Sequence, residues 1–430
     1  MLNIFNLTEK LQECNNYIGQ LEAQNAALRQ NIELDQKNRQ RDEVRKYENR
    51  KENYLRPIRE MADYVSHNFE FRHNVVRDSY ELRHRDSDDG WLPLDDRQLN
   101  TIMNLVQDEG HVYCLKSLVS QRIRSTIAAD YHPVADYLAS VRGKWDGHDR
   151  IDELACRIST SDYCRRLLPV WLRAMVAQWL STDPTHANAV MLLLISQQQG
   201  LQKSTFLHQL LPEALEQYYT DDFTLASKSN AERKLVEFAI INIDEFDKMN
   251  PKKMPDLKTL MQTLRPSFIK AYKTNFNRLP RIASFVGTSN QRHVLTDRTG
   301  SRRFLILEPD GIIRTEGIDH DQLYAQLVNE VEAGLPYFFN KEQEAEMQQA
   351  NLPYYRPTPI EQLLRQFFRS PVGDEEYQSL SAEQLMERLR RHAPSLLRQI
   401  STTVFAHTLL RLGFVRDHQH LGNTYRVVAL

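Results

Sequence analysis

The stretch that decides the fold is "AVMLLLISQQQGLQKSTFLHQLL", residues 189–211. It opens with a short, continuous apolar run, as expected for a strand that is buried on both faces. From Lys203 onward the apolar residues have helical spacing. The loop between the two ends in a lysine and a hydroxyl residue, Lys203 and Ser204. A loop of this kind between a strand and a helix is typical of a phosphate-binding site.

Glutamine stands where phosphate loops carry glycine. The pattern G-x-x-x-x-G-K-[ST] requires glycine at the positions of Gln197 and Gln202, whereas Gly200 lies inside the loop. Glycine is used there because the backbone needs a positive φ or approaches a phosphate closely. Glutamine at both positions is expected to cost about 1–3 kcal/mol each if the usual conformation is kept. The motif by itself is therefore weak, and the rest of the chain has to support it.

Three more predicted strands follow, and each carries polar residues at one end. They are "VEFAIINIDEFD" (236–247), "IASFVGTSN" (282–290) and "TGSRRFLIL" (299–307). Strands separated by helices predict a parallel α/β sheet with its site at the carboxyl ends of the strands. We expect this core to occupy residues 169–345.

The polar residues at these strand ends suit phosphate chemistry. Asp244 could hold Mg²⁺ together with Ser204, and Glu245 could polarise an attacking water. Asn290 could orient that water. Arg302 or Arg303 could neutralise charge across a subunit boundary. Each residue also has an ordinary interpretation, as a helix cap, a turn residue or a surface arginine, so their common order along the chain carries the prediction.

The first 52 residues are predicted to form a coiled coil and a charged helical linker. Apolar residues recur at alternating steps of three and four, which is a heptad pattern. The a positions are Ile4, Leu11, Ile18, Asn25 and Ile32, and the d positions are Leu7, Cys14, Leu21 and Leu28. Isoleucine at a with leucine at d favours two parallel strands, and a lone asparagine at a fixes their register. The alternative is an amphipathic helix that lies on the protein's own body.

Two further regions flank the core. Residues 53–168 are expected to form an α-rich domain, in which "FEFRHNVVRDSYELRHR" (69–85) alternates as a hairpin. After a proline-marked linker, "NLPYYRPTP" (351–359), residues 357–430 contain three short helices and a hairpin. That is the outline of a winged helix, a module that binds DNA or protein partners.

Composition bounds the class of protein. The chain has 430 residues, an apolar fraction of 41%, a net charge of -2 and four scattered cysteines. The cysteine spacing predicts neither a zinc site nor a disulfide framework, and a reducing cytoplasm fits best. No apolar run reaches membrane-spanning length. Because the chain as a whole is not basic, any DNA binding must come from local patches.

The residues of the core resemble a known family. "SQQQGLQKSTFLHQLLP", "IINIDEFD", "LPRIASFVGTSN" and "DRTGSRRFLIL" are similar, in this order, to the motifs of the virulence-associated protein E family. Members are P-loop ATPases of phages and mobile elements, related to superfamily 3 primase-helicases. The resemblance covers about residues 130–310. It implies a superfamily 3, AAA+-like fold with bound ATP and Mg²⁺.

The resemblance also implies roles for residues. Lys203 and Ser204 would form the Walker A pair, Asp244 and Glu245 the Walker B pair and Asn290 sensor 1, with Arg302 or Arg303 as the arginine finger. The nucleotide would also contact the rest of the loop, which is Gln199, Gly200, Leu201, Gln202 and Thr205. A hairpin in "SFIKAYKTNFNRLPR" would grip DNA through Lys270, Lys273, Arg278 and Arg281, beside the aromatic residues Tyr272 and Phe276. The alternative is a solvated hairpin with its aromatic residues in the core.

The sequence thus supports two main hypotheses. The first is a homo-oligomeric, favoured as hexameric, ATP-driven helicase-like motor that acts on single- or double-stranded DNA in replication or maintenance of a mobile element. A separate primase is a candidate partner. The second is a catalytically weak scaffold or initiator that binds DNA, because the glutamines would slow the site. A third possibility keeps the ATPase as a switch in phage defence.

Overall fold

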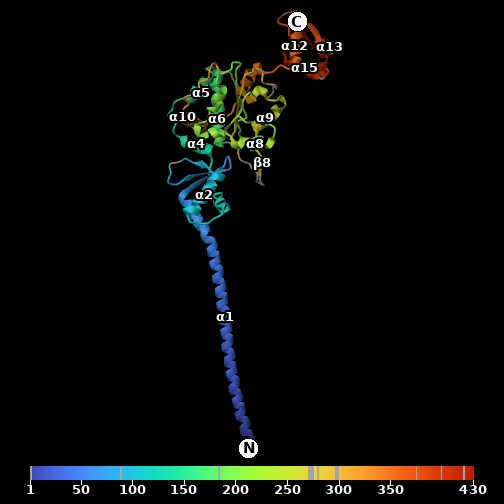
Figure 1. Cartoon of the computed structure of the whole chain (residues 1–430). Helices are drawn as coiled ribbons and strands as arrows, with labels where there is room; N and C mark the ends of the chain where they lie inside the picture. Colours follow the sequence, from blue (N-terminus) through green and yellow to red (C-terminus); the bar gives the residue numbers. More distant parts are fainter. Residues whose placement is uncertain are drawn as a thin grey trace. The chain divides into compact units, whose positions relative to one another are not determined.

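The computed structural model describes residues 2–87, 90–182, 185–269, 276–277, 280–295, 300–373, 375–398, 400–419 and 422–430. The chain divides into two compact units, residues 1–132 and 133–430 (Figure 1). The phosphate loop and all four predicted core strands belong to the second unit.

The first unit combines one very long helix with a small sheet. Its strands have the order β3-β2-β1-β4, and β4 runs parallel to β1. The elements are α1 Leu2–Asn68, β1 Phe69–Asn74, β2 Ser79–His84, β3 Leu92–Pro93, α2 Asp96–Asp108, α3 Lys116–Ile123 and β4 Ala129–Tyr131. Helices outweigh strands over residues 53–168, but the first unit also contains this four-stranded sheet, and it ends at residue 132 and not at the predicted 168.

The predicted hairpin of the first unit is confirmed. Strands β1 and β2 pair antiparallel from Phe69 opposite His84 to Asn74 opposite Ser79. Asn74 is buried, and its Oδ1 accepts hydrogen bonds from the amides of Val76 and Arg77, both at 3.1 Å. An asparagine that satisfies the amides of the following turn stabilises the reversal of the chain.

The second unit is built around a parallel sheet of five strands in the order β11-β5-β10-β7-β6. All four pairings are parallel, which confirms the predicted architecture. The sequence patterns missed β6, because it has only two residues. The strands are β5 Met191–Ile195, β6 Tyr219–Thr220, β7 Ile240–Ile243, β10 Ser284–Ser289 and β11 Phe304–Leu307.

Helices cover both faces of this sheet. Helices α8 and α9 pack on the face that includes Leu193, Ile241 and Phe285, and α6 and α10 lie on the other side (Figure 1). The helices are α4 Pro133–Val141, α5 Arg150–Ile158, α6 Asp162–Trp179, α7 Lys203–His208, α8 Lys228–Glu237, α9 Met254–Gln262, α10 His320–Glu332 and α11 Lys341–Ala350. The predicted boundary at 168/169 falls inside α6, which begins at Asp162 after the capping side chain of Ser161. No helix in the described part of the chain is both long and apolar enough to cross a membrane.

The central strand β10 contains a glycine with a packing role. Gly287 pairs with Leu193 of β5 on one side and with Ile243 of β7 on the other. A Cβ at this position would lie 2.4 Å from the Met191 methyl group and 2.9 Å from the carbonyl oxygen of Ile243. A larger residue at position 287 would therefore have to displace the backbone of β7 or the Met191 side chain of β5.

The C-terminal segment contains the three predicted helices (α12, α13 and α15) and the predicted hairpin (β14 and β15), adds β12, β13 and α14, and has its own apolar core. The elements are α12 Pro359–Phe367, β12 Phe368–Arg369, β13 Gln378–Ser381, α13 Ala382–Arg390, α14 Pro394–Leu397, α15 Thr402–Arg411, β14 Arg416–Gln419 and β15 Gly422–Ala429. The predicted linker before it begins too early. Tyr354 and Tyr355 are buried in the core of the parallel-sheet domain, and Tyr355 forms a β-bridge with Leu295.

Candidate nucleotide site

The strand order places three predicted site segments side by side. Strand β10, which leads to Asn290, lies between β5, which leads to the phosphate loop, and β7, which leads to Asp244 and Glu245. Because the strands are parallel, all three segments leave the sheet at the same edge. The polar side chains can therefore reach one another although 40 to 90 residues separate them in the sequence.

The loop from β5 to α7 has left-handed backbone conformations although glutamine stands at both glycine positions of the motif. Gly200 has a φ of 77° and Gln202 has a φ of 63°, so both residues are in the left-handed region. For a residue with a side chain this conformation costs about 1–2 kcal/mol. Leu201 between them is buried, and its carbonyl oxygen accepts a hydrogen bond of 3.1 Å from the amide of Ile313. Anchored packing thus holds the loop in a shape that glutamine alone does not favour, while the side chains of Gln199 and Thr205 remain exposed.

Lys203 follows this turn as the first residue of α7 and reaches the neighbouring strand. Its side chain is buried, and the Nζ donates to Asn290 Oδ1 at 2.9 Å and to the carbonyl oxygen of Ser196 at 3.5 Å. Burial lowers the pKa of Lys203, and the negative charge of Asp244 opposes this effect. Both hydrogen-bond acceptors are neutral and Asp244 acts only at a distance, so the ammonium forms no direct ion pair among the described residues and suits an anionic ligand.

Ser204 and Asp244 form the second link across the site. The Ser204 hydroxyl donates to Asp244 Oδ1 at 2.9 Å, and the Thr288 hydroxyl of β10 donates to the same oxygen. A hydroxyl and a carboxylate at this spacing are hard oxygen donors of the kind that Mg²⁺ prefers. No group of three or more His, Cys, Asp or Glu suited to a metal occurs among the described residues. A Mg²⁺ site that uses only one or two protein ligands, with phosphates as the others, fits this arrangement.

Glu245 lies next to Asp244 but is held away from the loop. Its backbone is left-handed, with a φ of 51°, and its carboxylate forms an ion pair of 2.6 Å with Lys248. Both side chains of this pair are largely exposed, so the interaction is weak enough for another partner to replace. The next acid, Asp247, accepts a hydrogen bond of 2.8 Å from Ser289 of β10.

The two predicted finger residues occupy different environments in the 3-10 turn η4, Ser301–Arg303. Arg302 is exposed and forms an ion pair of 3.1 Å with Glu344 of α11. Arg303 is half-buried, and its Nε is buried without a hydrogen-bond partner among the described residues. The buried Asn351 donates to the carbonyl oxygens of Ser301 and Phe304, both at 2.9 Å, and thereby fastens the turn. Arg302 is thus the arginine that is presented on the surface of the subunit.

The predicted DNA-gripping residues have different outcomes. Lys270, Lys273 and Arg278 lie outside the described residues, although strands β8 Phe268–Ile269 and β9 Phe276–Asn277 pair antiparallel as a hairpin requires. The prediction for Arg281 is wrong. Its side chain is 2% exposed, and its guanidinium donates at 2.6–3.5 Å to the carbonyl oxygens of Asn188, Leu260, Met261, Thr263 and Ala283. All three of its nitrogens donate to the backbone, and the buried guanidinium is not accessible to phosphate.

Sequence reasoning missed several residues of the site. Thr288 contacts the same oxygen of Asp244 as Ser204, and Lys248 and Glu344 hold Glu245 and Arg302. A signal was available for Thr288, because it lies two positions before Asn290 near the end of the same predicted strand, and side chains on one face repeat every two residues. No comparable signal marks Lys248 or Glu344.

One cavity of the molecule adjoins the candidate nucleotide site, and a second one belongs to the first unit. A cavity of about 460 Å³ adjoins the acidic end of β7 and is lined by Asp244, Glu245 and Lys248 as well as by Phe223, Leu225 and Met249. It extends the site beyond the two acids, on the side of the edge strand β6. An apolar wall beside the carboxylates offers contacts to a ligand that is larger than phosphate alone.

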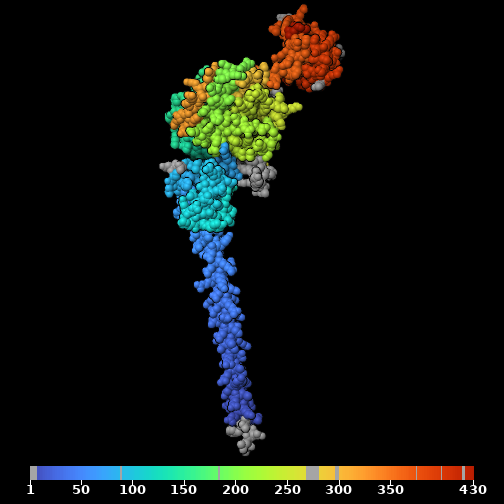
Figure 2. Space-filling view, in the orientation of Figure 1, coloured from blue at the N-terminus to red at the C-terminus, as the bar shows by residue number. Residues whose placement is uncertain are grey.

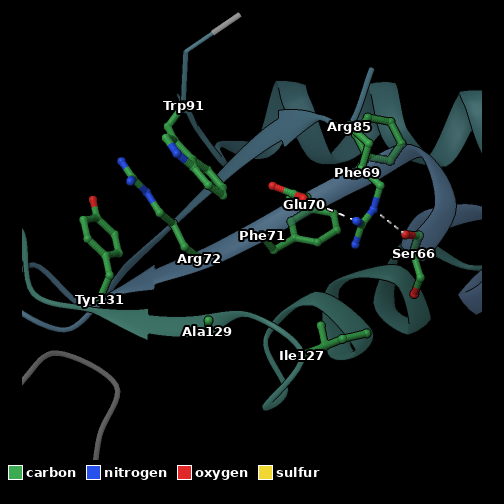
Figure 3. Close-up of a pocket in the computed structure, with 10 residues that line it drawn as sticks. All are labelled: Ser66, Phe69, Glu70, Phe71, Arg72, Arg85, Trp91, Ile127, Ala129 and Tyr131. Atoms are coloured by element: carbon green, nitrogen blue, oxygen red, sulfur yellow. Dashed lines mark hydrogen bonds and ion pairs between the residues drawn. The ribbon is translucent and has the colours of Figure 1, made fainter. Parts of the chain in front are cut away.

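The other cavity, of about 430 Å³, lies in the first unit (Figure 3). Arg72 stacks between the rings of Trp91 and Tyr131, with its guanidinium carbon 4.3 and 3.9 Å from their centres. Arg72 also pairs with Glu81, and Arg85 pairs with Glu70 at 3.3 Å and donates to the carbonyl oxygen of Ser66. The cations that line this cavity are therefore matched within the unit, which favours a structural role.

A match to a family model agrees with the family suggested by the motifs. A family model described as "Virulence-associated protein E-like domain" matches residues 138–355, and a model described as a domain of unknown function (DUF3874) matches residues 357–427. No curated protein matches the chain. Among solved structures, "The apo structure of NrS-1 C terminal region (305-718)" has 12% identity and a TM-score of 0.44, covering 87% of this chain and 99% of that chain. A second structure of that region, its A form, has 12% identity and a TM-score of 0.41, with the same coverage.

The family model spans 218 of the 430 residues, from the helices that precede the parallel sheet to the tyrosines that close its core. It includes every residue of the candidate nucleotide site. The chain belongs to the virulence-associated protein E-like family.

Proposed function

We propose that this protein is a magnesium-dependent ATPase that assembles as a homo-oligomer and drives a helicase-like motor on DNA during replication or maintenance of a phage or mobile element. The observation that carries the proposal is the pairing across adjacent strand ends: Lys203 with Asn290, and Ser204 with Asp244. Family membership supports the setting in phages and mobile elements.

Different residues of the candidate nucleotide site would bind the phosphates and activate the attacking water. Lys203 would exchange its neutral partners for the outer phosphates of ATP, which matches its buried charge better than an amide does. Ser204 and Asp244 would hold Mg²⁺, which neutralises phosphate charge when it is bound. Asn290, released from Lys203, would be free to orient a water molecule, and the Glu245 carboxylate would accept the proton of that water. This last role requires Glu245 to leave Lys248.

The arginine turn supports an active site shared between subunits. Arg302 is exposed and belongs to a turn that Asn351 fixes, whereas Arg303 faces its own fold. We propose that Arg302 contacts the ATP of a neighbouring subunit after its release from Glu344. Hydrolysis would then depend on assembly, as in a ring, and six subunits remain the size favoured by the family resemblance.

The scaffold alternative rests on a specific observation. In this structure Glu245 is paired with Lys248 at 2.6 Å, and the loop holds Gln202 in a left-handed conformation. A site with these features would bind nucleotide and turn over slowly, which suits an initiator or a switch in phage defence. DNA dependence separates the two functions, since a motor must couple turnover to DNA.

The test is magnesium-dependent ATP hydrolysis by the full chain, with and without single-stranded DNA. We expect DNA to stimulate turnover, and Lys203→Ala and Glu245→Gln to reduce it by at least about 100-fold, as loss of one charge-stabilising or proton-accepting group commonly does. Lys144→Ala removes an exposed lysine of the same unit and should leave the rate unchanged. An inactive wild type at a concentration where it assembles would leave only the scaffold.

The same assay tests the shared site. Arg302→Ala alone and Lys203→Ala alone should both be inactive. Mixed oligomers of the two should regain part of the activity, because some interfaces combine an intact loop with an intact arginine. Failure to regain activity, in mixtures shown to contain both variants in one oligomer, would place the action of Arg302 within its own subunit.

A further inference from the structure

Most of helix α1 makes no contact with the rest of the described chain. The helix has 67 residues, and every residue from 7 to 54 is exposed (Figure 2). Only from residue 55 onward does α1 become partly buried in the first unit. Because most helical stability in water comes from packing of an apolar face, a bare segment of this length needs a partner.

The exposed segment carries an apolar stripe rather than scattered apolar residues. Six large apolar side chains, each 40–65% exposed, follow the alternating spacing of three and four that places them on one face: Leu7, Leu11, Ile18, Leu21, Leu28 and Ile32. Exposed apolar residues are normal when single, but a continuous stripe marks an interaction surface. The stripe ends near residue 32, and after it large apolar residues such as Leu34, Val44 and Tyr47 are isolated among polar and charged ones.

The polar positions of the stripe indicate the partner. Asn25 occupies an a position and Cys14 a d position. Two copies of the helix, parallel and in register, place Asn25 opposite Asn25, where the two amides can bond to each other. An antiparallel pair that overlaps residues 7–32 would instead set each Asn25 against Cys14, whose thiol is a weaker hydrogen-bond partner than a second amide.

The flanking positions permit self-pairing. In a parallel pair, each g residue faces the e residue five positions later on the partner helix. The resulting pairs combine Lys10 with Asn15, Tyr17 with Glu22, Gln24 with Arg29, and Asn31 with Gln36. None of these pairs brings like charges together, so nothing along the seam opposes a second copy.

We propose that residues 7–32 of α1 bind the same segment of a second copy of this chain as a parallel, in-register, two-stranded coiled coil. This interaction is independent of the proposed ATPase, since it uses no residue of the nucleotide site. It makes the dimer the unit of assembly. Any larger oligomer then contains an even number of subunits, either as pairs within one ring or as one subunit from each of two rings.

The first test measures the mass of the full chain by light scattering, in the Lys203→Ala background and without nucleotide, so that nucleotide-driven assembly does not contribute. We expect a dimer. The double variant Leu21→Glu with Leu28→Glu should raise the dissociation constant by at least about 100-fold, because it places charges in the apolar seam. The matched double variant Ala23→Glu with Gln30→Glu puts the same charges on the opposite face and should remain a dimer.

The second test determines direction and register through Cys14, the exposed one of the four cysteines. A short bismaleimide should join two chains, and the covalent dimer should be absent from Cys14→Ser and present in Cys156→Ser. A monomer, or a dimer that survives Leu21→Glu with Leu28→Glu, would overturn the proposal. A seam-dependent dimer that Cys14 cannot cross-link would overturn the parallel register.

Discussion

The sequence predicts that Lys203 and Arg281, two cations of the parallel-sheet domain, each bind an anionic ligand. The structure places these two buried cations in different surroundings. Both side chains are at most 7% exposed, and burial lowers the pKa of each. Lys203 donates to one side-chain amide and, at 3.5 Å, to one carbonyl oxygen. Arg281 donates to five carbonyl oxygens that come from three separate segments.

The difference separates a binding cation from a structural one. Every partner of Arg281 is a backbone carbonyl oxygen that the fold holds in place. Removing the arginine would therefore remove several buried hydrogen bonds. The partners of Lys203 are exchangeable, because an Asn290 side chain can turn away and a phosphate can take its place. Burial alone therefore does not identify a ligand-binding charge, whereas the nature of its partners does.

The largest effect is expected for Arg281→Met, which keeps the volume roughly constant and removes the donors. The free energy of unfolding should fall by about 3 kcal/mol or more, because several buried carbonyl oxygens lose their partners. Urea denaturation followed by circular dichroism measures the change. Arg265→Met, at an exposed arginine nearby, should change stability by less than about 0.5 kcal/mol. Equal effects of the two substitutions would contradict the structural role of Arg281.

A smaller effect, of opposite sign, is expected for Gln202→Gly beside Lys203. Glycine removes the steric cost of the left-handed φ at this position and should raise the free energy of unfolding by about 1 kcal/mol. Thermal unfolding of the full chain measures it. Gln198→Gly in the same loop is the control, because Gln198 does not have a positive φ; there, glycine should destabilise by about 0.5–1 kcal/mol. If both variants were destabilised, the loop's backbone would not be strained.

The smallest effect concerns the charge of Lys203 and depends on pH. Since burial lowers the pKa of Lys203, the unfolded chain holds this proton more tightly, and stability rises as pH approaches the ordinary value of 10.5. Lys203→Met should thus be more stable than the wild type at pH 7, by about 0.5–1 kcal/mol. The difference should shrink toward pH 10.5 in urea titrations at several pH values.

The control for this pH dependence is Lys252→Met, at an exposed lysine. Its stability should follow that of the wild type over the same range. A constant gap between Lys203→Met and the wild type would mean that packing, and not the buried charge, separates them.

Much of the core could be predicted because its signals are local. The apolar strands, the loop ending in Lys203 and Ser204, and the polar residues at the strand ends are readable one segment at a time. Parallel pairing then brings Lys203 to Asn290 and Ser204 to Asp244. Those contacts follow from the expected architecture without further information.

The rest depends on contacts between distant segments, which no local pattern encodes. Arg281 stands in a basic and aromatic stretch, and its burial is decided by carbonyls as far away as Asn188. Strand β4 has three residues and pairs with β1 across more than 50 positions, from Arg72 to Ala129, so the sequence patterns do not predict the sheet beyond its hairpin. Helix α1 also continues past the predicted boundary at residue 52 to Asn68, because Met61 and Val65 near its end pack in the first unit.

Gly287 has a consequence for the mutational tolerance of the family fold. The strand that contains it separates the phosphate loop from the acids, and a methyl group at position 287 would collide with the backbone of β7 and with the Met191 side chain of β5. A change at this position would alter the geometry of both halves of the site at once while leaving every polar residue intact. Retention of the charged residues is therefore not sufficient for this site: it also depends on an apolar position that contacts no ligand.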